Sequence, residues 1–256
     1  MAQQTYRAHG IVLRKTKLGE ADLVVTMLAE NGSQLRAVAK GARKPASSFS
    51  SRLELYSEAD LLLACGRSLD IVKEARLVES NDRLRRDMEH AAGAAPMAEL
   101  LDRVTQMGLE TPRLFALTKA ALASLSRVEA PQVPAVCAAH LLKTLAFAGL
   151  RPSFDVCVAC GRALDPEPNG GAAFLSYREG GVVCPACRAA ADVVRVPSET
   201  LGWCRALMGS TFADIEALRV DPATSFSVLR FCQVWIREHV GSNMKSLNFL
   251  FTCGLF

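Results

Sequence analysis

Apolar and polar positions alternate in short runs through the first 80 residues, with turn residues between the runs. This alternation predicts strands, because successive side chains of a strand point to opposite faces. The predicted strands are Tyr6–Lys15, Leu23–Ala29, Ser33–Lys40, Leu53–Cys65 and Leu69–Val78. Asn31-Gly32, between the second and third strands, favours a hairpin. Five short strands in about 75 residues predict a small barrel of the OB type.

After Ser80 the apolar residues follow a helical period instead. The inward positions of the first helix are Met97, Leu100, Leu101, Val104 and Met107. Thr111-Pro112 and Asp221-Pro222 each resemble an N-cap followed by proline, and Ser198 can cap a third helix start. Gly149 predicts the end of a further helix.

Between these helical segments, residues 151–196 are rich in turns and carry two Cys-x-x-Cys units, Cys157/Cys160 and Cys184/Cys187, separated by 23 residues. Each unit can direct two thiolates at one ion, and two units complete the tetrahedral shell that Zn²⁺ prefers. Gly161 is expected to relieve crowding in the first turn. The intervening chain predicts a hairpin with strands Ala172–Arg178 and Gly181–Val183, and turns at Pro166, Pro168 and Asn169-Gly170.

A redox motif, an iron–sulfur cluster and free buried cysteines are the alternatives for these residues. A closed shell of four thiolates has no position for substrate, so we expect one structural zinc ion. The other cysteines stand alone in apolar surroundings and are expected to be buried packing residues: Cys65, Cys137, Cys204, Cys232 and Cys253.

Positive charge gathers at the N-terminus, where residues 1–52 hold nine Lys or Arg against three acids. Arg36 and Lys40 are expected on one face of a strand, and Lys40–Arg52 forms a cationic loop. Arg14, Lys15 and Lys17 add a basic turn near Gly19. Such a surface can follow a phosphate backbone. The alternatives are a solvated charged surface, or a zinc-ribbon adaptor that binds only proteins.

An enzyme has little support in the sequence, which lacks a P-loop, a Gly-x-Ser-x-Gly and a His-Glu-x-x-His motif. His140, on an apolar helix, is expected to be a hydrogen-bonded core residue. The first ten residues have no apolar signal region, and the most apolar span, Ala135–Leu150, contains His140 and Lys143 and is too short to cross a bilayer. We therefore expect a non-catalytic, cytoplasmic protein with reduced cysteines and no membrane partner.

Motifs distributed over the whole chain resemble those of the bacterial recombination mediator family RecO. In the N-terminal part they are Gly10–Arg14, Gly19–Asp22, Lys40–Pro45 and Ser51–Leu53. Further along they are Gly149–Pro152, Cys157–Gly161, Gly180–Cys184 and Lys245–Leu247. Some members lack the cysteines, so this chain resembles the branch that contains metal.

The resemblance implies an α+β multidomain fold, in agreement with the segmentation. Its expected parts are an N-terminal OB-fold β-barrel (1–80), an α-helical domain (81–150 and 197–245), an inserted four-cysteine zinc-binding subdomain (151–196) and a C-terminal tail (246–256). It also implies binding to single- and double-stranded DNA, strand annealing at the bacterial nucleoid, and two protein partners, RecR and the acidic C-terminal tail of single-stranded DNA-binding protein. The residues expected to contact DNA are Arg14, Lys15, Arg36, Lys40, Arg43, Lys44 and Arg52.

Overall fold

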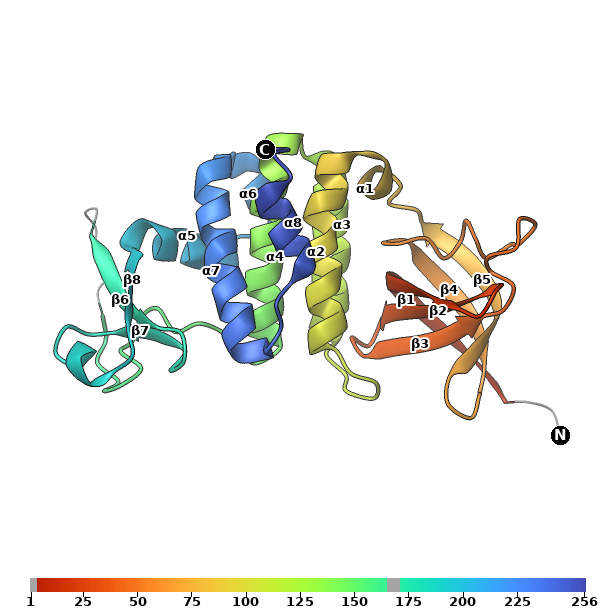
Figure 1. Ribbon diagram of the computed structural model, residues 1–256, viewed down its shortest axis with the longest axis horizontal. Coiled ribbons are helices and arrows are strands. Elements are labelled where there is room, and N and C mark those ends of the chain that lie inside the picture. Colours follow the sequence, from red (N-terminus) through yellow and green to blue (C-terminus); the bar gives the residue numbers. More distant parts are fainter. Residues whose placement is uncertain (1–3, 165–170) are drawn as a thin grey trace. The chain divides into compact units, whose positions relative to one another are not determined.

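The strands predicted at the N-terminus close into a barrel in the computed structural model (Figure 1), which describes residues 4–164 and 171–256. They are β1 (Thr5–Leu18), β2 (Asp22–Ala29), β3 (Gln34–Ala39), β4 (Glu58–Ala64) and β5 (Asp70–Glu79). Their order around the barrel is β1-β2-β3-β5-β4, and all neighbours are antiparallel except β3 and β5. The OB-like barrel is therefore confirmed.

Strand β1 pairs with two partners, β4 through its first half and β2 through its second. The register shifts between Val12 and Arg14, and such a bulge bends a strand so that it can serve both neighbours. Alternate side chains such as Val12, Met27 and Leu63 fill the barrel interior. The Asn31-Gly32 hairpin is confirmed, with β2 and β3 antiparallel on either side.

Several strand limits differ from the prediction. β1 continues past the predicted end at Lys15 to Leu18, so Lys17 lies in a strand and not in a turn. β3 ends at Ala39, which places Lys40 in the following turn. Residues 53–57 are not part of β4, because Tyr56 adopts a left-handed conformation (φ 67°) that interrupts a strand. Leu53 is nevertheless buried in the core, which explains its apolar signal.

The chain folds into two units, with the boundary between Arg127 and Val128. The first unit contains the barrel and the helices α1 (Arg83–Arg86), α2 (Met88–Val104) and α3 (Pro112–Arg127). Helix α3 begins at Pro112 as predicted. Met107 does not belong to the inward face of α2, because the helix ends before it and its side chain is 60% exposed.

The second unit contains the remaining helices, several of which pack against the almost entirely buried α4. They are η1 (Ala130–Gln132), α4 (Val133–Phe147), η2 (Arg188–Ala190), α5 (Ser198–Gly209), α6 (Phe212–Leu218), α7 (Pro222–Val240) and α8 (Lys245–Thr252). Asp221 caps α7 as predicted. Ser198 does not cap α5, since Pro197 occupies the cap position and Ser198 is already helical. Within the described ranges, no helix is long and apolar enough to cross a membrane.

A small antiparallel sheet with the order β7-β6-β8 follows α4 (Figure 1). Its strands are β6 (Ala172–Ser176), β7 (Gly181–Val183) and β8 (Val194–Pro197). The hairpin of β6 and β7 is confirmed, whereas β8 was not predicted. A Cβ on Gly181, the first residue of β7, would lie 2.3 Å from the Ser153 carbonyl oxygen. Glycine is therefore required at this position, because the loop that precedes the sheet passes close to it. The turns predicted at Pro166, Pro168 and Asn169-Gly170 lie outside the described residues.

Candidate metal centre and nucleic-acid interface

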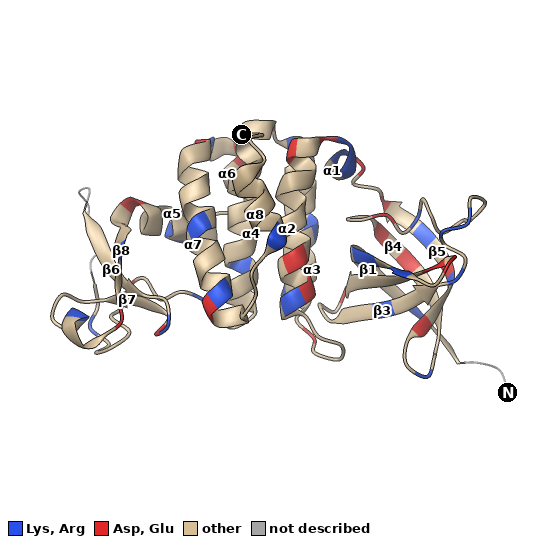
Figure 2. Cartoon of the chain, viewed as in Figure 1, with Lys and Arg blue, Asp and Glu red and all other residues tan. Residues whose placement is uncertain are grey.

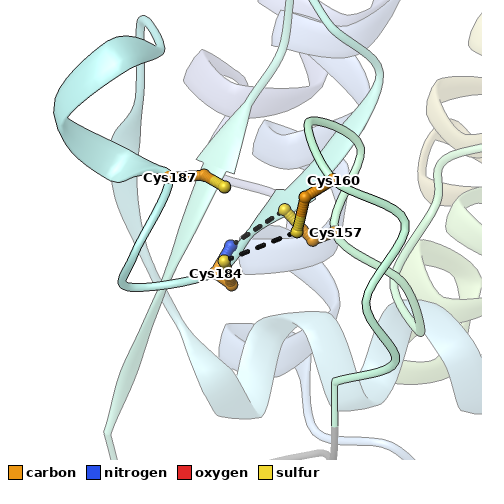
Figure 3. Close-up of side chains that lie close together, drawn as sticks. All are labelled: Cys157, Cys160, Cys184 and Cys187. Atoms are coloured by element: carbon orange, nitrogen blue, oxygen red, sulfur yellow. Dashed lines mark hydrogen bonds between the residues drawn. The ribbon is translucent and has the colours of Figure 1, made fainter.

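The four paired cysteines converge in the second unit (Figure 3). Cys157 and Cys160 belong to the loop before β6, while Cys184 and Cys187 follow β7. All four sulfur atoms lie within 4.8 Å of one another, and the Sγ atoms of Cys160 and Cys184 are 3.9 Å apart. A tetrahedral ion with metal–sulfur bonds of about 2.3 Å separates its sulfurs by about 3.8 Å. The four thiols can therefore hold one metal ion.

The surroundings of the thiols support this reading. The backbone N–H of Cys184 donates to Cys157 Sγ at 3.3 Å. Burial alone would raise the pKa of Cys157, but backbone N–H groups, that of Cys184 foremost, lower it to about 6. The pKa of Cys187 is instead raised to about 12 by its hydrogen bonds with Cys184 and Cys160. Four clustered thiols do not all ionise unaided, and a bound cation removes that penalty.

Two expectations about the cysteine region need correction. Gly161 has φ +73°, but a Cβ there would meet no atom within 4 Å, so backbone conformation and not crowding favours glycine. Cys65 is exposed and Cys253 is half-buried, because they lie at the ends of β4 and α8. Cys137, Cys204 and Cys232 are buried as predicted.

On the barrel, a groove of about 540 Å³ separates the second half of β1 from the segment between β3 and β4. We call it the Lys44 groove. Four cations and one acid line it: Lys15, Lys17, Arg43, Lys44 and Glu54. Phe49, Leu23 and Leu53 contribute apolar surface. The groove thus combines an excess of positive charge with an aromatic ring, as sites for single-stranded nucleic acid do.

The predicted DNA-binding residues differ in whether their hydrogen-bond partners are neutral carbonyl groups or charged carboxylates. Arg43 donates through Nη1 to the carbonyl oxygens of Gly19 (3.1 Å) and Glu20 (2.8 Å). Carbonyl groups orient a guanidinium without neutralising it, so Arg43 remains available to a phosphate. Lys17 and Lys44 are exposed, and neither ammonium has a partner among the described residues.

Two other cations of the predicted set are bound to carboxylates. Arg14 donates from Nε and Nη2 to Asp102 of α2, at 2.9 and 3.4 Å. Lys15 Nζ lies 2.6 Å from Glu54 Oε2. In each pair the acid compensates the positive charge that a phosphate would otherwise meet.

The remaining members of the predicted set lie outside the Lys44 groove. Arg52 lines an adjoining groove and donates to the Ala75 carbonyl oxygen at 3.0 Å. Arg36 lines a third groove, near the starts of β1 and β3. Lys40 is exposed at the turn after β3. The seven predicted residues therefore spread over the barrel, and only Lys15, Arg43 and Lys44 share one groove.

Three exposed cations beside Arg52 were missed: Arg7, Lys73 and Arg76. Figure 2 shows why charge counting overlooks the two in β5, since acidic residues alternate with basic ones along the barrel. Lys73 and Arg76 flank Glu74 in β5, so their segment has little net charge. Only the closed barrel brings them beside Arg52, whose position in the chain is more than twenty residues earlier.

An OB-like barrel, a set of helices and a four-cysteine cluster together define a multidomain α+β protein, of an architecture whose barrel commonly serves nucleic-acid binding. The family model "Recombination protein O N terminal" matches residues 1–81, and "Recombination protein O C terminal" matches residues 85–248.

Similar proteins named DNA repair protein RecO occur in several bacteria. The one from Roseiflexus sp. (strain RS-1) is 32% identical over 98% of this chain and 86% of its own length. That from Nocardioides sp. is 34% identical over 96% and 98%, and that from Frankia casuarinae 38% over 83% and 88%. The chain belongs to the RecO family, which supports a role in DNA repair and recombination.

Proposed function

We propose that this protein is a DNA-binding recombination mediator that binds single- and double-stranded DNA through the barrel. The observation that carries the proposal is the Lys44 groove, where Arg43 is held by carbonyl oxygens and Lys17 and Lys44 are free to meet phosphates. The protein anneals complementary strands without covalent chemistry. Cations reduce the repulsion between two phosphate backbones, and base pairing then drives the reaction.

In the same proposal, one zinc ion binds Cys157, Cys160, Cys184 and Cys187 and has a structural role. All four ligand positions are filled by protein, so the ion stabilises the loop and sheet without taking part in a reaction. Among the described residues, the apolar cluster around the thiols has three fully buried members, Cys157, Val183 and Cys184, which is a small core for the loop that holds them. Metal analysis distinguishes zinc from an iron–sulfur cluster, which would also bring inorganic sulfide.

The protein partners in this proposal are RecR and single-stranded DNA-binding protein. The acidic C-terminal tail of the latter would dock on the helices, and together with RecR the protein would help to load a RecA-type recombinase onto coated single strands. The family membership supports this role. Pull-down with tail peptides tests the first contact, with a peptide of scrambled sequence and equal charge as control.

The decisive experiment measures single-stranded DNA binding by fluorescence anisotropy at several salt concentrations. The variant K17A/R43A/K44A loses three phosphate contacts, so the slope of log K against log salt should fall by about 2, at about 0.7 per contact. The matched control R113A/R195A/R237A removes the same charge from exposed positions elsewhere and should keep the slope.

Two results would contradict the proposal. Equal loss of affinity in both triple variants would mean that net charge acts at a distance, without a defined groove. No binding by the unmodified protein at low salt would favour the alternative, a zinc-containing adaptor that contacts only proteins.

A further inference from the structure

A second groove, of about 680 Å³, adjoins the Lys44 groove on the barrel. We call it the Arg52 groove. β1, β4, β5 and the segment between β3 and β4 all contribute to it. Phe49 lines both grooves, so the two grooves are adjacent at this residue. The ring packs against the barrel core and remains partly exposed, which fixes it as a platform at the junction.

The Arg52 groove carries cations that are oriented but not neutralised. Arg52 donates to the Ala75 carbonyl oxygen at 3.0 Å, as Arg43 does to carbonyl groups in the first groove. Lys73 and Arg7 are exposed, and in the described residues neither side chain has a hydrogen-bond or ion-pair partner. Each can therefore contact a phosphate directly.

Three acids also line this groove, and they act differently. Asp60 is compensated, because Arg76 and, second, His9 hydrogen-bond to it and lower its pKa. Glu74 and Glu30 are exposed without a partner in the described part of the chain. The Arg52 groove is therefore only weakly positive. A strand would be held there less tightly than in the Lys44 groove, but Arg7, Arg52 and Lys73 would still offer cations to its phosphates.

We propose that a single DNA strand bound in the Lys44 groove continues past Phe49 into the Arg52 groove, so that one barrel holds one long strand along both. The proposal rests on the proposed function and names the path of the DNA at that site. Arg43 and Lys44 hold one part of the backbone, and Arg52 and Lys73 hold the next. A base at the junction stacks on Phe49.

Glu74 makes the path testable by a gain of affinity, which misfolding cannot imitate. Its carboxylate lies beside Lys73 and repels a passing backbone. Glu74→Lys should tighten the binding of an oligothymidylate of about 16 nucleotides several-fold at low salt and steepen its salt slope by about 0.7. An oligothymidylate of about 6 nucleotides occupies the more positive Lys44 groove, so its affinity should change less than twofold.

The complementary variant, R52A/K73A, should lower the salt slope for the 16-mer by about 1.4 and leave that for the 6-mer unchanged. R113A/R237A, with the same charge lost at exposed positions elsewhere, is its control. Stoichiometric titration should give one 16-mer per chain.

Other outcomes separate the two claims. If both oligonucleotides bind tightly and neither Glu74→Lys nor R52A/K73A changes their affinity, the extended path is overturned and the proposed function stands. Two 16-mers per chain would also overturn it, because the grooves would then hold separate strands. Absence of binding to either oligonucleotide by the unmodified protein would overturn the proposed function itself.

Discussion

Glu58 joins the barrel to helix α3 and offers a quantitative test of the fold around the grooves. Its side chain is 3% exposed at the start of β4. One carboxylate oxygen, Oε1, lies 2.8 Å from His9 Nε2 of β1 and 2.7 Å from Lys119 Nζ of α3. The His9 ring also packs edge-on against Phe115 of α3, with 5.4 Å between ring centroids. Glu58 therefore contacts side chains from two elements, the His9 ring of β1 and the Lys119 ammonium of α3.

The two contacts should contribute unequally. Lys119 is 56% exposed, so water can replace Glu58 around its ammonium, and Lys119→Ala should cost under about 1 kcal/mol. Glu58→Ala removes both hydrogen bonds from a buried position and opens a small cavity. It also leaves Asp60 as the remaining hydrogen-bond partner of the His9 ring, which is 21% exposed. Charge-assisted hydrogen bonds contribute about 1.5–3 kcal/mol each, and screening at Lys119 reduces one of them. We expect a loss of about 2–4 kcal/mol for Glu58→Ala.

Amide hydrogen exchange of β1 and β4 measures this loss in the barrel. Both tryptophans, Trp203 and Trp235, belong to the second unit, so urea unfolding followed by tryptophan fluorescence reports that unit separately and should change little. Glu238→Ala, at an exposed position on α7, is the control and should stay within about 0.5 kcal/mol of the unmodified protein. If the amides of β1 and β4 exchanged as fast in the Lys119→Ala variant as in the Glu58→Ala variant, the two contacts would contribute equally, and the argument from exposure would be wrong.

The remaining predictions concern the metal, a buried histidine, a turn glycine and an ion-paired arginine. Cys184→Ser should lower zinc from one equivalent per chain and speed amide exchange in β6 and β7; a full equivalent by metal analysis would contradict the site. Burial lowers the pKa of His140 from 6.5 to about 3, so the folded chain keeps the ring neutral while the unfolded chain binds a proton. Stability is then complete above pH 6.5 and falls with pH by about 1.4 kcal/mol per unit towards pH 3; His140→Leu should remove this slope in urea titrations between pH 7 and 5. Gly32→Ala should cost more than about 2 kcal/mol by exchange of β2 and β3, because φ is +78° and the new Cβ would lie 1.9 Å from a carbonyl oxygen before α3; a loss under 1 kcal/mol would contradict this. Arg14→Ala should leave the salt slope of DNA binding unchanged, whereas Arg43→Ala should lower it by about 0.7; equal slopes would refute the distinction between carboxylate-held and carbonyl-held cations.

The cysteine cluster could be predicted from the sequence because its geometry is mostly local. Each Cys-x-x-Cys turn brings two sulfurs together, and only the meeting of the two turns needs tertiary structure. The hairpin between them could also be predicted, because two apolar runs flank the turn residues Glu179-Gly180-Gly181. β8 was missed because it is only four residues long and ends in Pro197, and a proline argues against a strand.

The barrel could be predicted as a class, but its strand ends could not. Leu53 and Tyr56 are apolar and buried like strand residues, although the backbone at Tyr56 is left-handed. Burial without regular structure gives the same pattern as a strand, and the prediction extended β4 by five residues for that reason. The prediction also extended β3 by one residue at each end, to Ser33 and Lys40.

The proposed nucleic-acid interface is the part least predictable from the sequence, because the availability of a cation depends on its partner and not on its neighbours in the chain. Arg14 and Arg43 both lie in basic segments of the sequence. Arg14 meets the carboxylate of Asp102, 88 residues away, whereas Arg43 meets only carbonyl oxygens. Composition counts the two charges as equal, but a phosphate finds one already compensated and the other oriented and free. Arg52 is oriented and free in the same way, because its partner is the Ala75 carbonyl oxygen. It lies in a groove whose cations come from distant parts of the chain, so a count of charge along the sequence does not reveal that groove.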